Sequence, residues 1–287
     1  MITLPEAFEQ EMKQLLGEEE YEAYRKTFDE AVHRGLRVNN GKISTEEFLR
    51  RTDIPLKKVP WIPNGFYYDE ESCNPAKDAD YYAGLYYLQE PSAMTPASRL
   101  PIEPDDRVLD LCAAPGGKAT ELGSRIGEGG MLLANDISNS RAKALLRNLE
   151  IQGVGRLLVT SEDPEKLVTL YPAFFDKILL DAPCSGEGMF RKESSMLRYY
   201  SENGPEHYVP IQKKLIEQAY QMLAEGGELL YSTCTFSVKE NEEVIAGLLD
   251  AHPDMEVQEI TPGYEGFAPG VSVNLSLIHI SEPTRPR

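Results

Sequence analysis

Two cysteines have the residue type and the position for covalent chemistry. Cys184 lies in the segment D-A-P-C-S-G-E-G and Cys234 in S-T-C-T, and each segment follows an apolar run typical of a buried strand. A cysteine is a strong nucleophile at neutral pH once its thiolate form is favoured. We therefore expect one of the thiols to add to an electrophilic carbon. The spacing alone leaves open which of the two attacks.

Other cysteine chemistries fit the sequence less well. The four cysteines are scattered, with no C-x-x-C pair and no histidine at ligand spacing, which argues against a disulfide framework and against a zinc site. The histidines at 33, 207 and 252 lie away from the ends of the predicted strands, so a protease-like Cys–His pair is not expected. A zinc deaminase needs H-x-E with P-C-x-x-C, of which only Pro183-Cys184 is present. We therefore expect no metal.

A second segment, R-V-L-D-L-C-A-A-P-G-G-K-A-T at residues 107–120, has the pattern of a strand, a small-residue turn and a helix. Such a turn presents backbone N–H groups to an anionic group of a ligand, and Gly116 and Gly117 let the backbone approach without a Cβ. It is not the G-x-G-x-x-G of nicotinamide and flavin folds, and Pro115 removes one donor. A tight turn without any ligand also explains these residues, so the other strand ends must decide.

Acidic residues follow the next strands. Asp136 comes roughly 20 residues after the glycine turn, where a carboxylate can accept the hydroxyls of a ribose. Glu162 and Asp163 follow the third strand, and Asp181 ends the fourth. Each could be a helix cap or a turn residue, but acid, glycine or cysteine at five consecutive strand ends indicates a binding site.

Strands and helices alternate regularly from residue 107 onward. The predicted strands are 108–112, 131–136, 156–160, 176–181 and 228–232. The predicted helices are 118–126, 140–151, 164–170, 209–223 and 239–251. This alternation predicts an α/β fold, with a doubly wound parallel sheet that binds its ligand at the carboxyl ends of the strands.

The N-terminal region has a different pattern. Residues 1–33 are expected to form an amphipathic helix broken near Gly17, 35–39 a short extended segment, and Ser44 the N-cap of a helix. Between residues 31 and 58 there are seven Lys or Arg and three acids. They form either a solvated face or a patch that follows the backbone of a nucleic acid.

The whole chain is strongly acidic. Asp and Glu number 47 against 29 Lys and Arg, a net charge of −18, which argues against a general nucleic-acid binder but not against a local patch. There is no apolar run near 18 residues and no signal-peptide pattern, so we expect no membrane association and a cytoplasmic location. A monomer is expected.

Five segments together resemble the RNA cytosine-C5 methyltransferases of the Nop/Sun family. They are Y-A-G-L-Y-Y-L-Q-E-P-S-A-M, D-L-C-A-A-P-G-G-K, A-N-D-I-S, D-A-P-C-S-G-E-G and S-T-C-T, in the family's order between about residues 59 and 270. The likeness is strongest to the bacterial branch that acts on small-subunit (16S) rRNA. It implies a Rossmann-like class I methyltransferase fold with a small N-terminal α+β domain.

The resemblance also implies S-adenosylmethionine as the cofactor. Asp136 would take the ribose, Asp163 would lie near the adenine, and Asp181 would border both the cofactor and the target base. The methionine end would be lined by Cys112, Ala113, Ala114, Pro115, Gly116, Gly117 and Lys118.

The same resemblance assigns the thiols. Cys234 corresponds to the nucleophile that adds to C6 of a cytosine, after which C5 can attack the methyl group of the cofactor. Cys184 corresponds to the residue that helps to remove the C5 proton and to expel Cys234. The catalytic set is then Cys234, Cys184 and Asp181, and the target cytosine must leave its stack to reach it.

Other functions remain open at this point. One alternative is a tRNA cytosine-C5 methyltransferase. Another is a non-catalytic RNA-binding or ribosome-assembly factor that keeps the fold, against which the intact Cys184, Cys234 and Asp181 argue. A nucleotide-dependent oxidoreductase is disfavoured by the missing G-x-G-x-x-G.

The expected domains are a small RNA-binding domain at 1–75, a catalytic domain at 76–274 and a non-native tail at 275–287. The tail, L-S-L-I-H-I-S-E-P-T-R-P-R, resembles a translated sequencing adapter. Residues 255–260 (M-E-V-Q-E-I) alternate like a sixth strand. We expect the final strand of the sheet to be missing through truncation.

Overall fold

The computed structural model describes residues 3–193, 195–260, 263–268, 270 and 271. The chain forms two compact units. The first, here named the sheet unit, consists of His33–Asp181 and Gln218–Tyr231. The second, here named the cysteine unit, consists of the described parts of Met1–Val32, Ala182–Glu217 and Ser232–Arg287.

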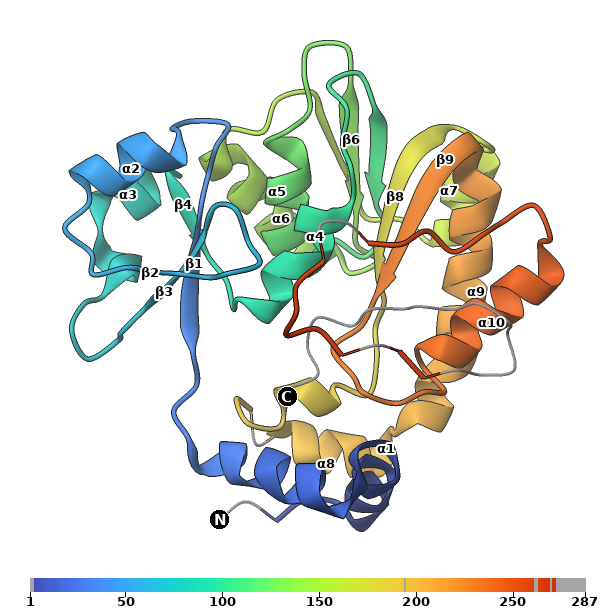
Figure 1. Cartoon of the computed structure of the whole chain (residues 1–287). Coiled ribbons are helices and arrows are strands. Elements are labelled where there is room, and N and C mark those ends of the chain that lie inside the picture. The colour runs from blue at the N-terminus through green and yellow to red at the C-terminus, as the bar shows by residue number, and fades with distance from the viewer. Residues whose placement is uncertain (1–2, 194, 261–262, 269, 272–287) are drawn as a thin grey trace. The chain divides into compact units, whose positions relative to one another are not determined.

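A five-stranded sheet in the order β7-β6-β5-β8-β9 forms the centre of the sheet unit (Figure 1). Its strands are β5 (Arg107–Asp110), β6 (Met131–Asn135), β7 (Leu157–Thr160), β8 (Phe175–Asp181) and β9 (Leu223–Ser232). β5 runs parallel to both β6 and β8, and β6 runs parallel to β7. The predicted α/β fold is confirmed. Parallel pairing brings the carboxyl ends of β5, β6, β7 and β8 to the same edge.

Amphipathic helices connect these strands. They are α5 (Gly117–Gly123), α6 (Asn139–Gln152) and α7 (Pro164–Leu170), and α4 (Thr95–Arg99) precedes β5. Leu145 and Leu149 of α6 are one helical turn apart, and both are fully buried in the cluster that contains Val108 and Leu132 of the sheet. The apolar side of α6 therefore faces the strands, as its sequence periodicity predicts.

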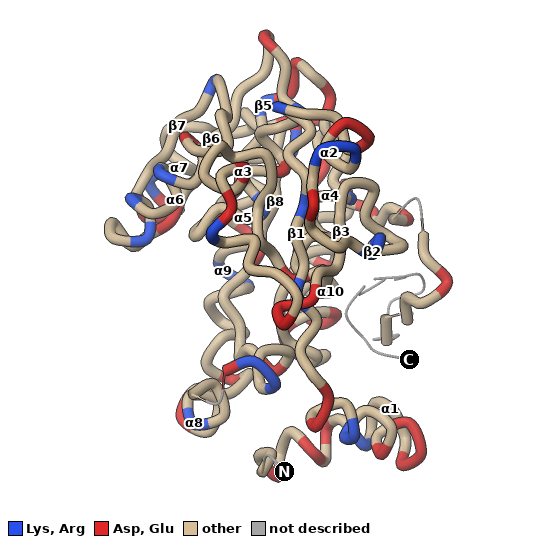
Figure 2. Tube along the Cα trace, turned by 90° about the vertical axis from the view of Figure 1, so that its left-hand side faces the viewer, with Lys and Arg blue, Asp and Glu red and all other residues tan. Residues whose placement is uncertain are grey.

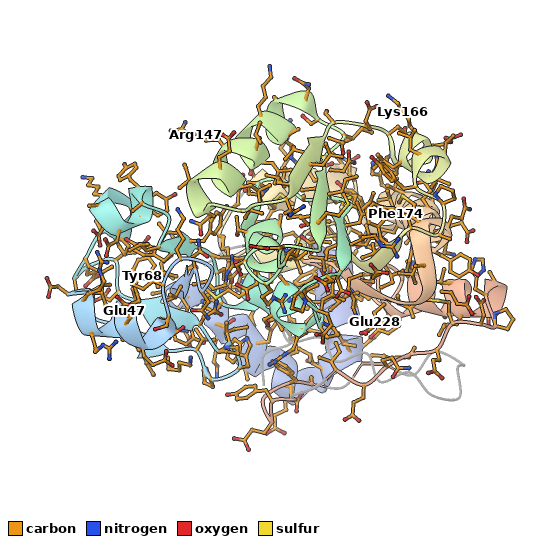
Figure 3. All side chains as sticks on the ribbon, turned by 90° about the horizontal axis from the view of Figure 1, so that it is seen from above. Glu47, Tyr68, Arg147, Lys166, Phe174 and Glu228 are labelled. Carbon is orange, nitrogen blue, oxygen red and sulfur yellow. The ribbon has the colours of Figure 1, made fainter. Side chains whose placement is uncertain are left out.

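Charged pairs fix the amino ends of the strands, where Phe174 and Glu228 lie (Figure 3). Arg107 at the start of β5 pairs with Asp176 of β8 at 2.6 Å, and its guanidinium lies 4.7 Å from the centre of the Phe174 ring. Lys177 of β8 pairs with Glu228 of β9. These contacts hold neighbouring strands in register at the edge opposite to their carboxyl ends.

A second, antiparallel sheet precedes the large one within the sheet unit. Its order is β2-β3-β1-β4. The strands are β1 (Arg34–Val38), β2 (Lys57–Lys58), β3 (Gly65–Tyr68) and β4 (Tyr86–Leu88), accompanied by α2 (Thr45–Arg51) and α3 (Ala79–Tyr82) and by the 3₁₀ turns η2 (Pro75–Lys77) and η3 (Ser92–Met94). The predicted cap is confirmed, because the Ser44 hydroxyl accepts the N–H of Glu47 at 3.1 Å.

The cysteine unit is helical. It contains α1 (Glu6–Lys26), the 3₁₀ turns η1 (Thr27–Asp29) and η4 (Glu187–Met189), α8 (Ser195–Glu202), most of α9 (Pro205–Met222), and α10 (Glu242–Ala251). The predicted break in the first helix is confirmed, since Gly17 has a φ of +76° inside α1. Phe8 of α1 packs edge-to-face on Phe190, with ring centres 5.0 Å apart, in a cluster that also holds Tyr24 and Phe236.

The prediction of a sixth strand is wrong. Residues 255–260 have no strand pairing; their sequence alternates, but their side chains are half-buried or exposed. Alternation of this kind also suits an extended segment on a surface, and sequence periodicity alone cannot tell the two apart. The expected last strand and the tail at 275–287 fall on residues outside the described ones.

Candidate active site

Three acids and a thiol meet at the carboxyl edge of the large sheet. Asp110 ends β5, Asp181 ends β8 and Asp136 directly follows β6. Burial raises the pKa of the Cys112 thiol strongly, and the charges of Asp110, Asp181 and Asp136 raise it further. The structure thus brings together three site residues predicted from the sequence, Cys112, Asp136 and Asp181, and adds Asp110 to them. An unliganded Cys112 stays protonated and is no nucleophile.

Lys118 supplies the positive charge of this group. It lies in the first turn of α5, and its Nζ contacts Oδ2 of Asp181 at 2.6 Å. Both side chains are only partly exposed, at 16% for Lys118 and 33% for Asp181. The pair links the glycine turn to the end of β8, and Lys118 balances the charge of Asp181.

The glycine turn is shaped by packing as well as by any ligand. Gly116 has a φ of +111°, which only glycine adopts readily. A Cβ on Gly117 would lie 2.9 Å from the side-chain amide nitrogen of Gln89, and the Gly117 carbonyl accepts a hydrogen bond from Arg37 at 2.7 Å. The alternative of a tight turn without a ligand is therefore supported by packing, because residues of the small sheet and of α6 contact the turn.

Asp136 is held in place from two sides. It is 3% exposed, its Oδ1 accepts the N–H of Ser138 at 2.9 Å, and its Oδ2 lies 3.1 Å from Arg141. The preceding residue, Asn135, binds across to β7, since its Oδ1 accepts the Thr160 hydroxyl at 2.8 Å. These bonds fix the carboxylate at the strand end, with lone pairs left for a ligand hydroxyl.

Asp163 has a structural role of its own. Its Oδ1 caps α7 by accepting the N–H of Glu165 at 2.9 Å, and its side chain is exposed. The expected contact with an adenine is not tested by this geometry and stays a prediction. The preceding acid, Glu162, pairs with Lys166 of α7 at 2.7 Å (Figure 3).

Asp110 was missed by the sequence reasoning. Its side chain is fully buried, and neither carboxylate oxygen reaches hydrogen-bond geometry with a described residue. Burial, and next the charge of Asp181, raise the pKa of Asp110 to about 8, while Lys118 and a weak contact with the Cys112 amide act in the opposite direction. A buried acid without good partners is a recognised mark of a ligand site. The signal in the sequence was an acid inside an otherwise apolar strand.

The two sequence-predicted thiols are in direct contact within the cysteine unit. The Sγ atoms of Cys184 and Cys234 are 3.1 Å apart, and the Cys234 N–H points to the Cys184 sulfur at 3.3 Å. Cys184 is 8% exposed, whereas Cys234 is exposed. The hydrogen bond with Cys234, and next burial, raise the pKa of the Cys184 thiol well above its usual value. Cys184 therefore stays protonated, and its S–H can donate a hydrogen bond to Cys234. Cys234 is the sulfur that a substrate can reach.

The backbone around Cys234 is fixed by the segment that follows Cys184. The N–H of Gly188 donates to the Cys234 carbonyl at 2.9 Å, and a Cβ on Gly188 would lie 2.9 Å from that oxygen. The carboxylate of Glu187 accepts the N–H of Phe236 at 2.9 Å. The E-G of D-A-P-C-S-G-E-G thus has a structural reason, since it pins the second cysteine segment.

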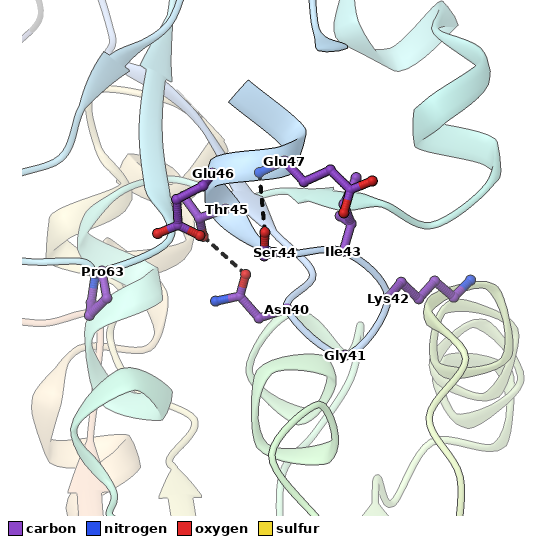
Figure 4. A pocket seen from close by; sticks show the side chains of 9 residues that line it. All are labelled: Asn40, Gly41, Lys42, Ile43, Ser44, Thr45, Glu46, Glu47 and Pro63. Carbon is purple, nitrogen blue, oxygen red and sulfur yellow. Dashed lines mark hydrogen bonds between the residues drawn. The ribbon is translucent and has the colours of Figure 1, made fainter. Parts of the chain in front are cut away.

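A surface hollow of about 500 Å³ lies elsewhere, at the start of α2 (Figure 4). Its polar lining is already used, because Ser44 caps the helix and Thr45 donates to Asn40 at 3.0 Å. None of the predicted site residues lines it. Among the described residues, no cluster of His, Cys, Asp or Glu suits a metal ion, and no helix is long and apolar enough to cross a membrane.

Two family models match the chain. Residues 97–281 match "16S rRNA methyltransferase RsmB/F", and residues 4–91 match the "N-terminal domain of 16S rRNA methyltransferase RsmF". Two curated relatives are called "Ribosomal RNA small subunit methyltransferase F". The one from Erwinia tasmaniensis is 38% identical over 262 residues, and the one from Escherichia coli O157:H7 is 35% identical over 262 residues. Each alignment covers 88% of this chain and 55% of the relative, so the chain spans about half the length of these proteins.

Solved structures are similar as well. A methyltransferase homologue from Pyrococcus horikoshii is 31% identical with a TM-score of 0.73, over 86% of this chain and 78% of that one. The structure titled "NSun6 from Pyrococcus horikoshii with SFG" has a TM-score of 0.78 at 23% identity, over 93% of this chain and 91% of that one. The second likeness shows a shared fold.

Proposed function

Because the chain belongs to the 16S rRNA methyltransferase RsmB/F family, we propose that it transfers a methyl group from S-adenosylmethionine to C5 of a cytosine in small-subunit rRNA. The observation that carries this proposal is the pair of sulfurs, Cys184 and Cys234, 3.1 Å apart with one buried and one exposed. A pair of unequal thiols in contact suits a reaction that needs one nucleophile and one proton-transfer group.

The exposed thiol is the nucleophile in this proposal. Cys234 gives its proton to water and adds to C6 of the cytosine as a thiolate, so that an S–C6 bond forms and the electron pair of the C5–C6 π bond makes C5 electron-rich. During this addition Cys184 stays protonated, because its pKa is raised, and its S–H can donate a hydrogen bond to the attacking Cys234 sulfur. The roles match those that the sequence resemblance implies, and exposure provides an independent reason for them.

Release needs the second thiol. After C5 has taken the methyl group, the C5 proton must leave and the S–C6 bond must break, so that the electron pair of the C5–H bond restores the C5–C6 double bond. We assign this step to Cys184, which gives its own proton to water once Cys234 is bonded to C6 and then takes the C5 proton as a thiolate, in contact with the departing Cys234 sulfur. The leaving thiolate of Cys234 is stabilised by the S–H hydrogen bond from its neighbour.

The residues of the sheet unit fit the proposed cofactor. S-adenosylmethionine carries a sulfonium and an ammonium group, two ribose hydroxyls and one carboxylate, and it supplies an electrophilic methyl group. The buried carboxylate of Asp110, whose oxygens lack good partners, can accept an ammonium group, and Asp136 has lone pairs for the ribose. An ammonium group bound beside Asp110 would favour the charged form of this carboxyl, whose pKa burial raises to about 8.

An exposed apolar side chain extends this site. Ile137, directly after Asp136, is 67% exposed and therefore accessible to a ligand at this strand end. We assign it to one face of the adenine, while the predicted roles of Asp163 near the adenine, of Asp181 beside the target base and of Cys112–Lys118 at the methionine end remain parts of the same proposal.

The RNA would also contact residues 1–75. In the described structure Arg50 and Lys57 of this region are exposed, whereas Arg37 is buried and cannot contact RNA. Figure 2 shows the acidic residues at the start of α2 in red and the basic residues at its end in blue. A cytoplasmic location and a monomeric state belong to the proposal too.

A methyl-transfer assay tests the proposal. The chain is incubated with radiolabelled S-adenosylmethionine and, separately, with 16S rRNA in its subunit, with free 16S rRNA and with tRNA. Label on C5 of a cytosine in rRNA is the expected result, with bisulfite sequencing to locate it. Label on tRNA alone would favour the tRNA enzyme. Binding of rRNA without any transfer would favour a non-catalytic assembly factor.

A further inference from the structure

A buried carboxylate, Glu240, holds the segment that bears Cys184. Glu240 lies just before α10 and has no exposed surface. Its Oε1 accepts the N–H of Ser185 and the side-chain amide of Gln212, both at 2.9 Å, and its Oε2 accepts the Ser185 hydroxyl. Because Ser185 directly follows Cys184, these bonds fix the backbone on one side of the buried thiol.

Gln212 fixes the other side. Its amide nitrogen, which donates to Glu240, also donates to the Pro183 carbonyl at 2.9 Å. Gln212 belongs to α9 and is fully buried like Glu240. The residues before and after Cys184 are thus tied to one carboxylate and one amide on two other elements of the cysteine unit.

The second cysteine segment is tied to the same place. The Ser185 hydroxyl lies 2.8 Å from the Thr235 hydroxyl, and Thr235 directly follows Cys234. Asn241, next to Glu240, accepts the Thr233 hydroxyl at 2.7 Å and donates to the Thr235 carbonyl at 3.2 Å. The adjacent side chains of Glu240 and Asn241 therefore hold the neighbours of both thiols.

A carboxylate in this place needs an explanation. A buried charge is costly unless hydrogen bonds satisfy it, and an apolar side chain of similar volume would give packing without that cost. Here three donors meet the carboxylate, and two of them come from Ser185. Ser185 and Thr235, which directly follow the two cysteines, connect Glu240 with both cysteine segments.

We propose that Glu240 is a positioning residue of the methyl transfer, which holds the segments of Cys184 and Cys234 so that their sulfurs stay in contact. The proposal rests on the proposed function of the two thiols. It requires hydrogen-bond acceptance by Glu240 and not its charge. A glutamine can place its oxygen toward the Ser185 N–H and Gln212 and turn its amide toward the Ser185 hydroxyl, whereas an alanine can do neither.

The first test is kinetic and uses the full chain with its RNA substrate. In Glu240→Ala we expect kcat to fall about 100-fold, because displacements of about 1 Å between reacting groups cost that much. KM for S-adenosylmethionine should stay within about twofold, since the proposed cofactor residues belong to the sheet unit. Glu240→Gln should recover most of kcat. Glu242→Gln is the matched control, because Glu242 is equally buried and its carboxylate accepts the N–H of Val271 instead.

The second test measures the thiols without any substrate. In a glutathione buffer, Cys184 and Cys234 react with one oxidised glutathione to give their mutual disulfide and two reduced glutathiones, and the disulfide is identified by peptide mapping. The equilibrium constant reports how well the fold holds the sulfurs together. We expect it to fall about tenfold in Glu240→Ala, a change of about 30 mV in the potential of the pair, and to change little in Glu240→Gln.

Ser185→Ala is a second variant, which keeps the proposal testable if Glu240→Ala does not fold. It removes the hydroxyl that joins the two segments and leaves the Ser185 N–H and Gln212 with Glu240, so it should lower kcat and the thiol equilibrium in the same direction. Unchanged kcat and an unchanged thiol equilibrium in Glu240→Ala or Ser185→Ala would overturn the proposal. Equal loss in Glu240→Gln and Glu240→Ala would also overturn it, in favour of a role for the charge. If the unmodified chain transfers no methyl group, the proposed function fails, and the glutathione measurement alone decides whether Glu240 positions the thiols.

Discussion

Glu187 should make the cysteine unit less stable as the pH rises. Its side chain is 2% exposed, and burial, followed by the charge of Glu11, raises the pKa of this carboxyl from 4.5 to about 7. The hydrogen bond from the Phe236 N–H favours the charged form but does not offset burial. The folded state therefore holds the proton more tightly than the unfolded state.

The sign and size follow from linkage. A raised folded-state pKa gives stability that is complete below pH 4.5 and is lost as the pH rises through about 7. At 1.36 kcal/mol per pKa unit, the loss across the whole window is roughly 3 kcal/mol. Roughly 2 kcal/mol of it falls between about pH 5.5 and 8.5, a range that avoids the calculated isoelectric point near 4.7.

The assay compares Glu187→Gln with the unmodified chain. Glutamine is neutral at every pH, so the free energy of urea unfolding of the variant relative to the parent should rise by about 2 kcal/mol between about pH 5.5 and 8.5. Glu22→Gln, at an exposed position of α1, is the control and should show no such slope. A pH-independent difference between Glu187→Gln and the parent would refute the reasoning that burial dominates at this carboxyl.

Three further predictions concern the two units separately. Cys234→Ala should abolish methyl transfer and any covalent RNA adduct, whereas Cys184→Ala should let an adduct that resists denaturing gel electrophoresis accumulate; the reverse pattern would exchange the two roles. Asp136→Ala should weaken S-adenosylmethionine binding by about 1.5–3 kcal/mol in calorimetry with RNA binding unchanged, and unaltered cofactor affinity would remove Asp136 from the site. Arg37→Met should lower the unfolding free energy by about 3–5 kcal/mol in urea titrations, because it leaves the buried Glu121, 2.8 Å from Arg37, without its main partner; a loss below about 1 kcal/mol would show that the ion pair is not stabilising.

The strand ends could be predicted because they depend on local pattern. Apolar runs followed by acid, glycine or cysteine mark the ends of parallel strands, and the parallel order follows from the alternation with helices. Asp136, Asp181 and the turn at 112–118 were found in this way. Asp110 was not, because its burial arises from β6 and β8 on either side of β5, and a single strand does not show its neighbours.

Glu240 and Gln212 could not be predicted for a related reason. They are 28 residues apart in the sequence, and Glu240 and Ser185 are 55 apart. In the sequence they look like ordinary polar residues of helices, and their complete burial is visible only when α9 and the segment before α10 pack on the cysteine segments. Helix periodicity predicts which side of a helix is apolar but not which polar residue on that side is satisfied by a distant partner.

The basic segment between residues 31 and 58 shows the limit of counting charges. Arg37 is buried against Glu121, Arg34 pairs with Glu70 at 2.9 Å, and Lys42 donates to two backbone carbonyls, those of Ala83 and Ile151. A net positive count therefore overstates the charge that is available to a phosphate backbone. Arg37 instead fixes the turn that leads into α5, since it also binds the Gly117 carbonyl and the Thr120 hydroxyl.

The first helix of the chain, α1, packs on residues close to both cysteine segments. Phe8 and Tyr24 of α1 pack on Phe190 and Phe236, with ring centres 5.0 and 6.0 Å apart, and these two phenylalanines follow the two cysteine segments closely. The N–H of Phe236 binds Glu187, the residue that starts the 3₁₀ turn before Phe190. Packing of α1 therefore bears on the segments of both thiols within one unit, whatever RNA the N-terminal region contacts. A substitution at Phe8 that leaves every polar residue intact should for this reason disturb the contact between the two sulfurs before it disturbs the cofactor residues of the sheet unit.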